Sequence, residues 1–290
     1  MRNIYKYDIV LLILQIPRSE EGWREVANGF CLKWNFPHCI GALDGKHVQI
    51  EAPENSGSVY YNYHGTFSIV LMAIADADYR IIYADVGCQG RISDGGVFAN
   101  TTFYNKLINN ELKLPKPTCL SEKIQSQVTP FVLVADDAFS LNTNLMKPFP
   151  GPYPKGSQER AFNYRLSRAR RIIENVFGLL ATVFRVFRKP IPLHPKKVES
   201  VVLACISLHN FLRRNAQSVR MYTPPGTFDS EDLDTGSITP GSWRAETEGS
   251  LLDLQRIPRN ASQEAKEIRK EFAKYFISEE GKVPWQDRFA

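Results

Sequence analysis

The chain has 290 residues, of which 43% are hydrophobic and 23% are charged, and it carries a net charge of +5 with a pI of about 8.9. This composition is typical of a globular protein with a sizeable core, and the mild positive charge is compatible with a polyanionic partner. No apolar run reaches the roughly 18 residues of a membrane span, and five scattered cysteines without a C-x-x-C pair argue against a zinc site and indicate reduced thiols.

The predicted elements begin with one helix and three strands. A helical pattern follows Ser19, which can cap it, and acidic residues occupy its first turn. The segment "HCIGALDGKHVQIEAP" predicts a strand, and residues 67–75 and 80–86 predict a hairpin. Three consecutive strands of this kind favour an antiparallel meander.

The second half is predicted to contain one more strand and several helices. Residues 93–112 predict a helix that Ser93 or Asp94 caps, and "PFVLVADDAF" predicts a short central strand because its apolar residues are consecutive. An apolar stripe with alternating spacings of four and three residues predicts a long helix over residues 162–187. Further helices are predicted over 194–214 and 262–276, the last capped by Asn260 or Ser262.

Composition divides the chain into four parts. Residues 1–18 form an N-terminal extension. Residues 19–216 carry the periodic helices and strands that are expected to form one catalytic domain. Residues 217–256 are rich in Gly, Pro, Ser, Thr and acids and predict a flexible linker or loop. Residues 257–290 are expected to form a C-terminal helical segment.

The order of the elements predicts a mixed α/β fold. The fourth strand follows a helical crossover, so it should lie parallel to a strand that is already in the sheet. If it adds beside the first strand, Asp44 and Asp136 lie on neighbouring central strands. This is the connectivity of a ribonuclease-H-like fold, in which a mixed five-stranded sheet, an antiparallel meander plus parallel strands, is flanked by helices.

Three acidic positions allow both a structural and a functional interpretation. Asp44 interrupts an apolar strand, or else Asp44 and Gly45 form a hairpin turn. Asp136 and Asp137 end a strand, where acids cap the next element but where ligands also bind. Glu174 lies on a polar stripe beside the apolar one, yet it could simply pair with Arg170 or Arg171, at about 0.2–0.5 kcal/mol per pair.

Taken together, the three acids favour a metal site. Asp44, Asp136 and Glu174 would offer only oxygen ligands, which suit Mg²⁺ or Mn²⁺. Such a site can activate a water or a hydroxyl and stabilise the leaving oxygen, which is the chemistry of phosphodiester cleavage or transfer.

A basic segment accompanies these acids. Residues 155–189 contain nine Lys or Arg and two Glu. Arg165, Arg168 and Arg171 lie three residues apart on one helical face, and Arg170 adjoins them. A charge run of this kind is usually a solvated helix face, but beside an acidic metal site it predicts binding of DNA phosphates.

Several ordered motifs resemble the Harbinger/PIF-type transposases and the nucleases derived from them, which are DDE superfamily endonucleases. The motifs are "FPHCIGALDGKHVQI", "GRISDGGVF", "LVADDAF", "NYRLSRARRIIENVFG", "SLHNFL" and "VPWQ". The resemblance implies a ribonuclease-H-like domain and divalent-metal-dependent DNA cleavage by Asp44, Asp136 and Glu174. It also implies a further metal ligand or near-site acid at Asp94, which the residues themselves equally allow as a helix cap.

The chain departs from the family pattern in two places. Asp137-Ala138-Phe139 stands where the family commonly has Gly-Tyr after its second aspartate, and only about twenty residues precede the match, without the usual helix-turn-helix segment. The resemblance implies DNA and a Myb/SANT-like protein as partners, a nuclear location and a homo-oligomer. The alternative function is a catalytically silent DNA- or partner-binding protein that retains the fold. His38, His47 and His209 are expected to be structural.

Overall fold

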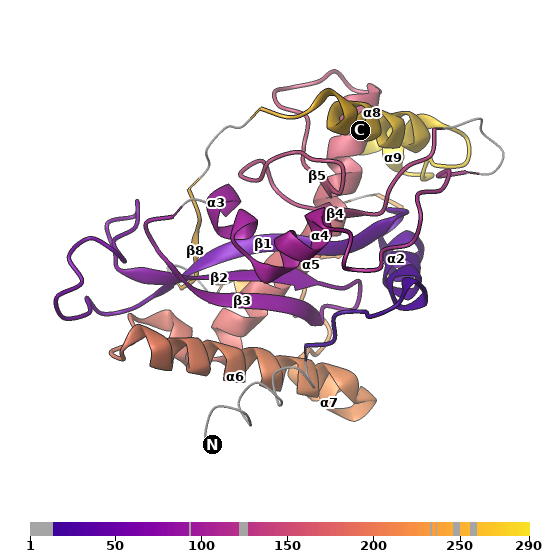
Figure 1. Ribbon diagram of the computed structural model, residues 1–290. Coiled ribbons are helices and arrows are strands. Elements are labelled where there is room, and N and C mark those ends of the chain that lie inside the picture. The colour runs from indigo at the N-terminus through magenta and orange to yellow at the C-terminus, as the bar shows by residue number, and fades with distance from the viewer. Residues whose placement is uncertain are drawn as a thin grey trace.

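A central sheet organises the molecule. The computed structural model describes residues 14–92, 94–121, 127–232, 234–235, 237–245, 250–255 and 260–290. The strands of this sheet are β1 (Cys39–Gln49), β2 (Ser68–Ala75), β3 (Ile81–Gln89), β4 (Val132–Val134), β5 (Leu145–Met146) and β8 (Leu252–Asp253). Their order is β3-β2-β1-β4-β5, and β8 pairs with β1 (Figure 1).

The pairing directions confirm the predicted connectivity. β1, β2 and β3 form an antiparallel meander, and β4 joins β1 in parallel. β5 then pairs with β4 in parallel. The mixed α/β sheet flanked by helices is therefore the ribonuclease-H-like arrangement that the order of elements predicted.

The edge of β1 that faces β4 is divided between two partners. β4 pairs with residues 39–42, whereas β8 pairs with Lys46 and His47. Asp44 lies between these two pairings, on a stretch of that edge that neither strand covers. Because β1 continues through Asp44 and Gly45 and pairs both with β2, the alternative of a hairpin turn at these residues is wrong.

Helices cover both faces of the sheet. They are α2 (Glu20–Trp34), α3 (Asp94–Ala99), α4 (Thr102–Ile108), α5 (Gln158–Val183), α6 (Pro195–Arg214), α7 (Ala216–Tyr222), α8 (Gln263–Ile277) and α9 (Gln286–Phe289). Ser19 and Ser262 cap α2 and α8, as predicted, and Ser157 caps α5. Within the described residues, no helix is both long and apolar enough to cross a membrane.

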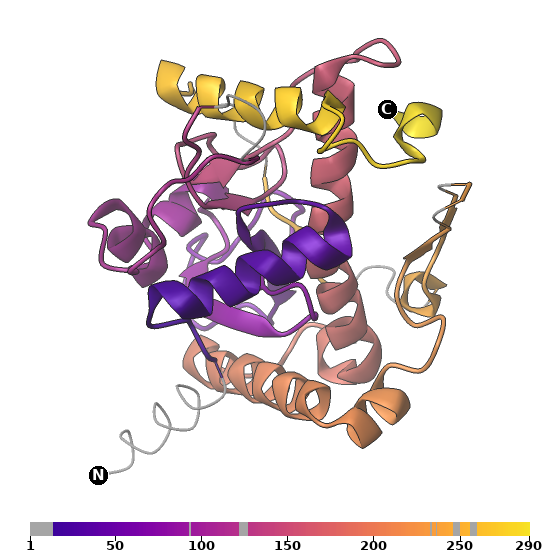
Figure 2. The ribbon, with the colours of Figure 1, turned by 90° about the vertical axis from the view of Figure 1, so that its right-hand side faces the viewer.

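Two apolar cores hold these layers together. The apolar stripe of α5, including Phe162, Ile173 and Leu180, is buried in one core with residues of α6 and α8. Trp23 of α2 and Phe103 of α4 belong to the other core, on the opposite face of the sheet. Figure 2 shows α8 crossing one end of α5, and α6 at its other end.

Two predicted boundaries differ from the structure. The helix expected over residues 93–112 is two short helices, because α3 ends at Ala99 and the Thr101 hydroxyl caps α4 by accepting the Tyr104 N–H. Residues 217–256, predicted to be a flexible linker or loop, contain short regular elements in their described parts. Their described parts include β6 (Ser230–Glu231), β7 (Ile238–Thr239), the 3-10 helix η2 (Ser242–Ala245) and β8.

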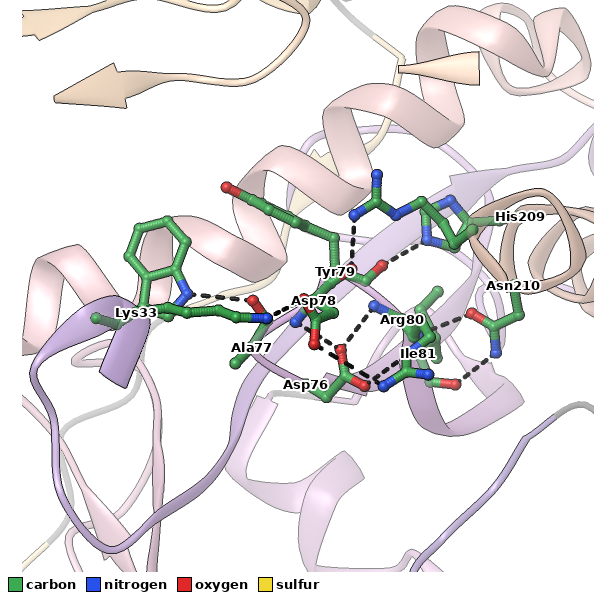
Figure 3. A network of polar contacts seen from close by, with 11 residues as sticks. Lys33, Asp76, Ala77, Asp78, Tyr79, Arg80, Ile81, His209 and Asn210 are labelled. Atoms are coloured by element: carbon green, nitrogen blue, oxygen red, sulfur yellow. Dashed lines mark hydrogen bonds and ion pairs between the residues drawn. The ribbon is translucent and has the colours of Figure 1, made fainter. Parts of the chain in front are cut away.

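The turn of the β2–β3 hairpin is fixed by the C-terminal half of α6. His209 contacts the Tyr79 carbonyl through Nε2 at 2.7 Å and the Tyr222 hydroxyl through Nδ1 at 2.9 Å. Asn210 binds both backbone polar groups of Ile81, accepting its N–H at 2.9 Å and donating to its carbonyl at 2.7 Å (Figure 3). The structural role predicted for His209 is therefore confirmed.

Candidate active site

The three predicted acids line a single cavity. It has a volume of about 290 Å³ and lies where β1, the chain after β4 and the middle of α5 meet. We call it the acid cavity. Its charged lining residues are Asp44, Lys46, Asp136, Arg170, Glu174, Arg244 and Asp253. Residues 44, 136 and 174 are far apart in the sequence, so only the fold brings their carboxylates together.

Each carboxylate is placed by a different element. Asp44 is buried in β1 at the uncovered stretch of its edge. Asp136 follows β4 by two residues, and its Oδ1 accepts the Ala138 N–H at 3.0 Å. Glu174 comes from α5, one residue away from the stripe that packs into the core. Asp137 is exposed and does not line the cavity. Asp136 is therefore the aspartate of this pair that lines the cavity.

Burial and the charge of Asp44 disfavour the charged forms of the other two carboxylates. Burial and the nearby charge of Asp44 raise the pKa of Asp136 to about 6, although Arg170 opposes this shift. Burial also raises the pKa of Glu174, which Asp44 raises further and Arg170 lowers. The cavity therefore favours an additional positive charge beyond the cations that the protein supplies.

Three basic side chains contact these acids. Lys46 Nζ lies 3.7 Å from Asp44 Oδ2 and also pairs with Asp253. Although burial lowers the pKa of Lys46, the charges of Asp44 and Asp253 raise it more, and the net shift is upward. Arg170 lies 3.3 Å from Glu174 Oε1, and Arg244 lies 4.0 Å from Glu174 Oε2.

A divalent metal fits this site by chemistry but finds no preassembled cage. Carboxylate oxygens are the ligands that Mg²⁺ and Mn²⁺ prefer, and Asp44, Asp136 and Glu174 supply them. Nevertheless, the described residues contain no group of three or more His, Cys, Asp or Glu side chains that could hold a metal ion as they stand. Two of the three carboxylates are instead engaged in ion pairs, with Lys46, Arg170 and Arg244.

Asp94, the fourth acid in the predicted metal set, begins α3. Its side chain lies outside the described part of the structure. Its predicted roles as a metal ligand or as a helix cap therefore both stay predictions.

Three of the four arginines predicted to bind DNA are buried. Arg165 donates to the Gly281 carbonyl at 2.8 Å, and its guanidinium lies 4.5 Å from the centre of the Phe276 ring. Arg168 and Arg171 lie 2.6 Å and 3.7 Å from the same Glu231 oxygen. The prediction of an exposed phosphate-binding face is therefore wrong for these three residues. Among the four arginines that the sequence predicted to bind DNA, Arg170 alone lines the acid cavity.

Sequence reasoning missed several lining residues, among them Lys46, Trp243, Arg244 and Asp253. Lys46 follows Asp44 by two positions on the same strand, so its placement on the same face could have been found from the strand period. Trp243, Arg244 and Asp253 come from the region expected to be a linker, where no periodicity places a side chain.

Comparisons with known proteins give a family match. The model of the family described as DDE superfamily endonuclease matches residues 43–210, which is more than half of the chain. The match covers Asp44, Asp136 and Glu174.

Curated relatives are distant. "Protein ALP1-like" of Arabidopsis thaliana is 28% identical over 185 residues, covering 61% of this chain and 43% of its own length. "Putative nuclease HARBI1" of Mus musculus is 23% identical over 219 residues, covering 74% of this chain and 58% of its own length. The corresponding human protein is 23% identical over 209 residues, covering 71% and 55%. The chain thus spans about half the length of the relatives it matches. No solved structure matches it significantly.

Proposed function

The chain belongs to the DDE superfamily endonucleases, and from that premise we propose that it is a divalent-metal-dependent endonuclease that hydrolyses phosphodiester bonds in DNA. The observation that supports this proposal most is the convergence of Asp44, Asp136 and Glu174 on the acid cavity. Three carboxylates are costly to gather in a partly buried site unless a cation joins them there.

Asp44, Asp136 and Glu174 would together hold Mg²⁺ or Mn²⁺. The bound metal would supply positive charge at the phosphodiester and lower the pKa of the attacking water. Hydrolysis forms a bond from the water oxygen to phosphorus and breaks one phosphorus–oxygen ester bond. The roles of the chain's own residues follow from their contacts. Arg170 opposes the upward shift of the Glu174 pKa, and Lys46 pairs with Asp44 while it is held by Asp253.

Exchange of ion pairs is part of this proposal. Lys46, Arg170 and Arg244 occupy the carboxylates in the structure. To hold a metal, Glu174 would have to give up its ion pair with at least one arginine. That guanidinium would then be able to donate two parallel hydrogen bonds to a phosphate group.

A second candidate function is a silent DNA- or partner-binding protein that retains the fold. The observation that favours it is the same set of ion pairs, together with the lack of a preassembled metal-binding group among the described residues. Under this alternative, Lys46 and Arg170 substitute permanently for the metal, and the chain does not cut DNA.

A nicking assay separates the two candidates. Supercoiled plasmid is incubated with the protein and Mg²⁺ or Mn²⁺, with and without a chelator, beside Glu174→Gln. The matched control is Glu159→Gln, which changes a glutamate in the first turn of the same helix, outside the acid cavity.

The endonuclease proposal predicts metal-dependent nicking by the parent and by Glu159→Gln, and its loss in Glu174→Gln. Absence of nicking by the parent, with salt-sensitive DNA binding intact, supports the silent protein instead. Equal nicking by the parent and by Glu174→Gln would place the activity outside this cavity and contradict the proposal.

A further inference from the structure

The chain between α7 and α8 places one basic residue at the edge of the acid cavity. We propose that Arg244 is a substrate-binding residue that holds a DNA phosphate beside the cleaved bond, and that the described residues of the segment 227–245 (227–232, 234–235 and 237–245) form a strap that positions it. This inference rests on the proposed function, because it names the group that receives the substrate backbone at the same site. Figure 2 shows this segment rising from α7 alongside α5.

The strap is anchored to α5 by the residue next to Glu174. Asn175 is completely buried, and its Oδ1 accepts the Trp243 Nε1–H at 2.7 Å and the Asp229 N–H at 3.1 Å. One side chain of α5 therefore ties down two points of the strap. Since Glu174 and Asn175 are adjacent on one helix, the position of the strap is fixed relative to the catalytic carboxylate.

A glycine of α5 makes room for the strap. The indole of Trp243 occupies the space that a Cβ on Gly178 would fill. Gly178 therefore allows the aromatic ring to approach the helix backbone. Little more than one turn of α5 thus contains the carboxylate of Glu174, the hydrogen-bond acceptor of Asn175 and the glycine, Gly178, that makes room for the Trp243 ring.

Arg244 is held on two sides by the strap itself. Its Nε and Nη2 donate to Asp229 Oδ1 and Oδ2 at 2.8 Å and 2.6 Å, and its guanidinium lies 4.4 Å from the centre of a Trp243 ring. Asp229 is buried and also accepts the Gly241 N–H at 2.8 Å. A guanidinium fixed in this way loses little conformational entropy when it binds a ligand.

Exposure distinguishes Arg244 from the other cations of the cavity. Its side chain is 45% exposed, compared with 16% for Arg170 and 15% for Lys46. Arg170 and Lys46 are thus suited to balance carboxylates inside the cavity, whereas Arg244 can meet a chain that passes across it. A phosphate is the expected ligand, because the proposed substrate is a polyanion and Arg matches its geometry.

DNA binding at several salt concentrations tests this role without requiring cleavage. The probe is a fluorescein-labelled duplex of mixed sequence in chelator-containing buffer, and the variants are Arg244→Gln, Arg244→Lys and Gly178→Ala. The matched control is Arg220→Gln, an exposed arginine of α7 outside the acid cavity. For Arg244→Gln we expect a Kd about tenfold higher and a salt slope smaller by about 0.9, the value for one lost phosphate contact.

The other variants separate charge from position. Arg244→Lys keeps the charge, so the salt slope should recover while part of the affinity stays lost. Gly178→Ala leaves every charge in place but displaces Trp243, so it should weaken binding as Arg244→Gln does. Arg220→Gln should behave as the parent.

Two results would overturn the inference. An unchanged salt slope in Arg244→Gln would reduce Arg244 to a structural partner of Asp229, and a parent without salt-sensitive binding would exclude any phosphate contact. Nicking by the parent reports separately on the proposed function. A parent that nicks DNA beside an Arg244→Gln variant with normal binding overturns this inference alone. A parent that binds DNA through Arg244 but does not nick it overturns only the endonuclease proposal.

Discussion

Gly178 and Trp243 are a matched pair: the indole ring lies against the α5 backbone in the space where any other residue at position 178 would place its Cβ. The nearby Asn175 fixes the same ring by accepting its Nε1–H. These two contacts connect the 3-10 helix η2, which carries Trp243, to the helix that carries Glu174. The geometry of the acid cavity therefore depends on residues 227–245 as well as on the sheet.

Gly178→Ala is predicted to loosen the strap and leave the core intact. The added methyl group displaces Trp243, whereas the helix itself tolerates alanine better than glycine. Amide hydrogen exchange should accelerate in residues 237–245 and stay unchanged in β1 and β2. Gly29→Ala in α2 is the control, because the new Cβ would meet only the Ala77 side chain there, at 3.1 Å. Unchanged exchange in the strap would show that Trp243 does not hold it.

Glu231→Gln is predicted to destabilise the fold strongly. The Glu231 carboxylate neutralises the buried side chains of Arg168 and Arg171, and it also accepts the Tyr164 hydroxyl at 2.6 Å. Removing its charge leaves two buried guanidinium groups unpaired, which typically costs about 3–5 kcal/mol. Urea denaturation measures the loss, with Glu267→Gln on the exposed face of α8 as the control. A loss no larger than that of the control would contradict the structural assignment of these arginines.

Arg170→Gln is predicted to shift the acid limb of the pH–rate profile upward. Arg170 lowers the pKa of both Asp136 and Glu174, so without it both carboxylates hold their protons to higher pH. Metal binding requires the ionised carboxylates, and activity should therefore decline at a higher pH than in the parent. Nicking rates measured across the acid range test this. A profile that shifts downward or stays in place would show that Arg170 does not control these groups.

His209 is predicted to make stability depend on pH. Burial lowers its pKa to about 4, below the ordinary histidine value of 6.5. Between these values the unfolded chain binds a proton that the folded chain does not, so stability is full above the upper value and falls as the pH decreases. The urea midpoint should therefore drop between pH ~7 and pH ~5, and the drop should be smaller in His209→Gln.

His47 is a second residue that makes the stability depend on pH. Burial also lowers the pKa of His47 to about 4, so His209→Gln should reduce the drop without abolishing it. An identical drop in parent and variant would mean that His209 does not titrate as its buried position requires.

The sheet could be predicted because its connectivity follows from element order. A helical crossover before residues 130–139 forces β4 to lie parallel to an existing strand, and this brings Asp136 close to Asp44. The position of Glu174 followed from helical spacing beside the apolar stripe. Each of these inferences uses local periodicity together with a general rule of chain connection.

The surroundings of the acids could not be predicted in this way. The local run of basic residues predicts that Arg168 and Arg171 face solvent. Their partner Glu231 lies some sixty residues further along the chain, in a segment without periodicity. The place of Arg244 depends on its pairing with Asp229 and on the fit of Trp243 against Gly178. Contacts of this kind are set by tertiary packing of a loop, which carries no repeating sequence signal.

Anomalous diffraction from crystals soaked in Mn²⁺ tests the central claim most directly, because it locates the metal independently of any activity. The proposed endonuclease predicts an anomalous peak in the acid cavity within ligand distance of Asp44, Asp136 and Glu174, and its loss in Asp136→Asn. A parent crystal with no Mn²⁺ peak at these three carboxylates, at concentrations of Mn²⁺ that saturate carboxylate sites elsewhere on the molecule, would contradict the account.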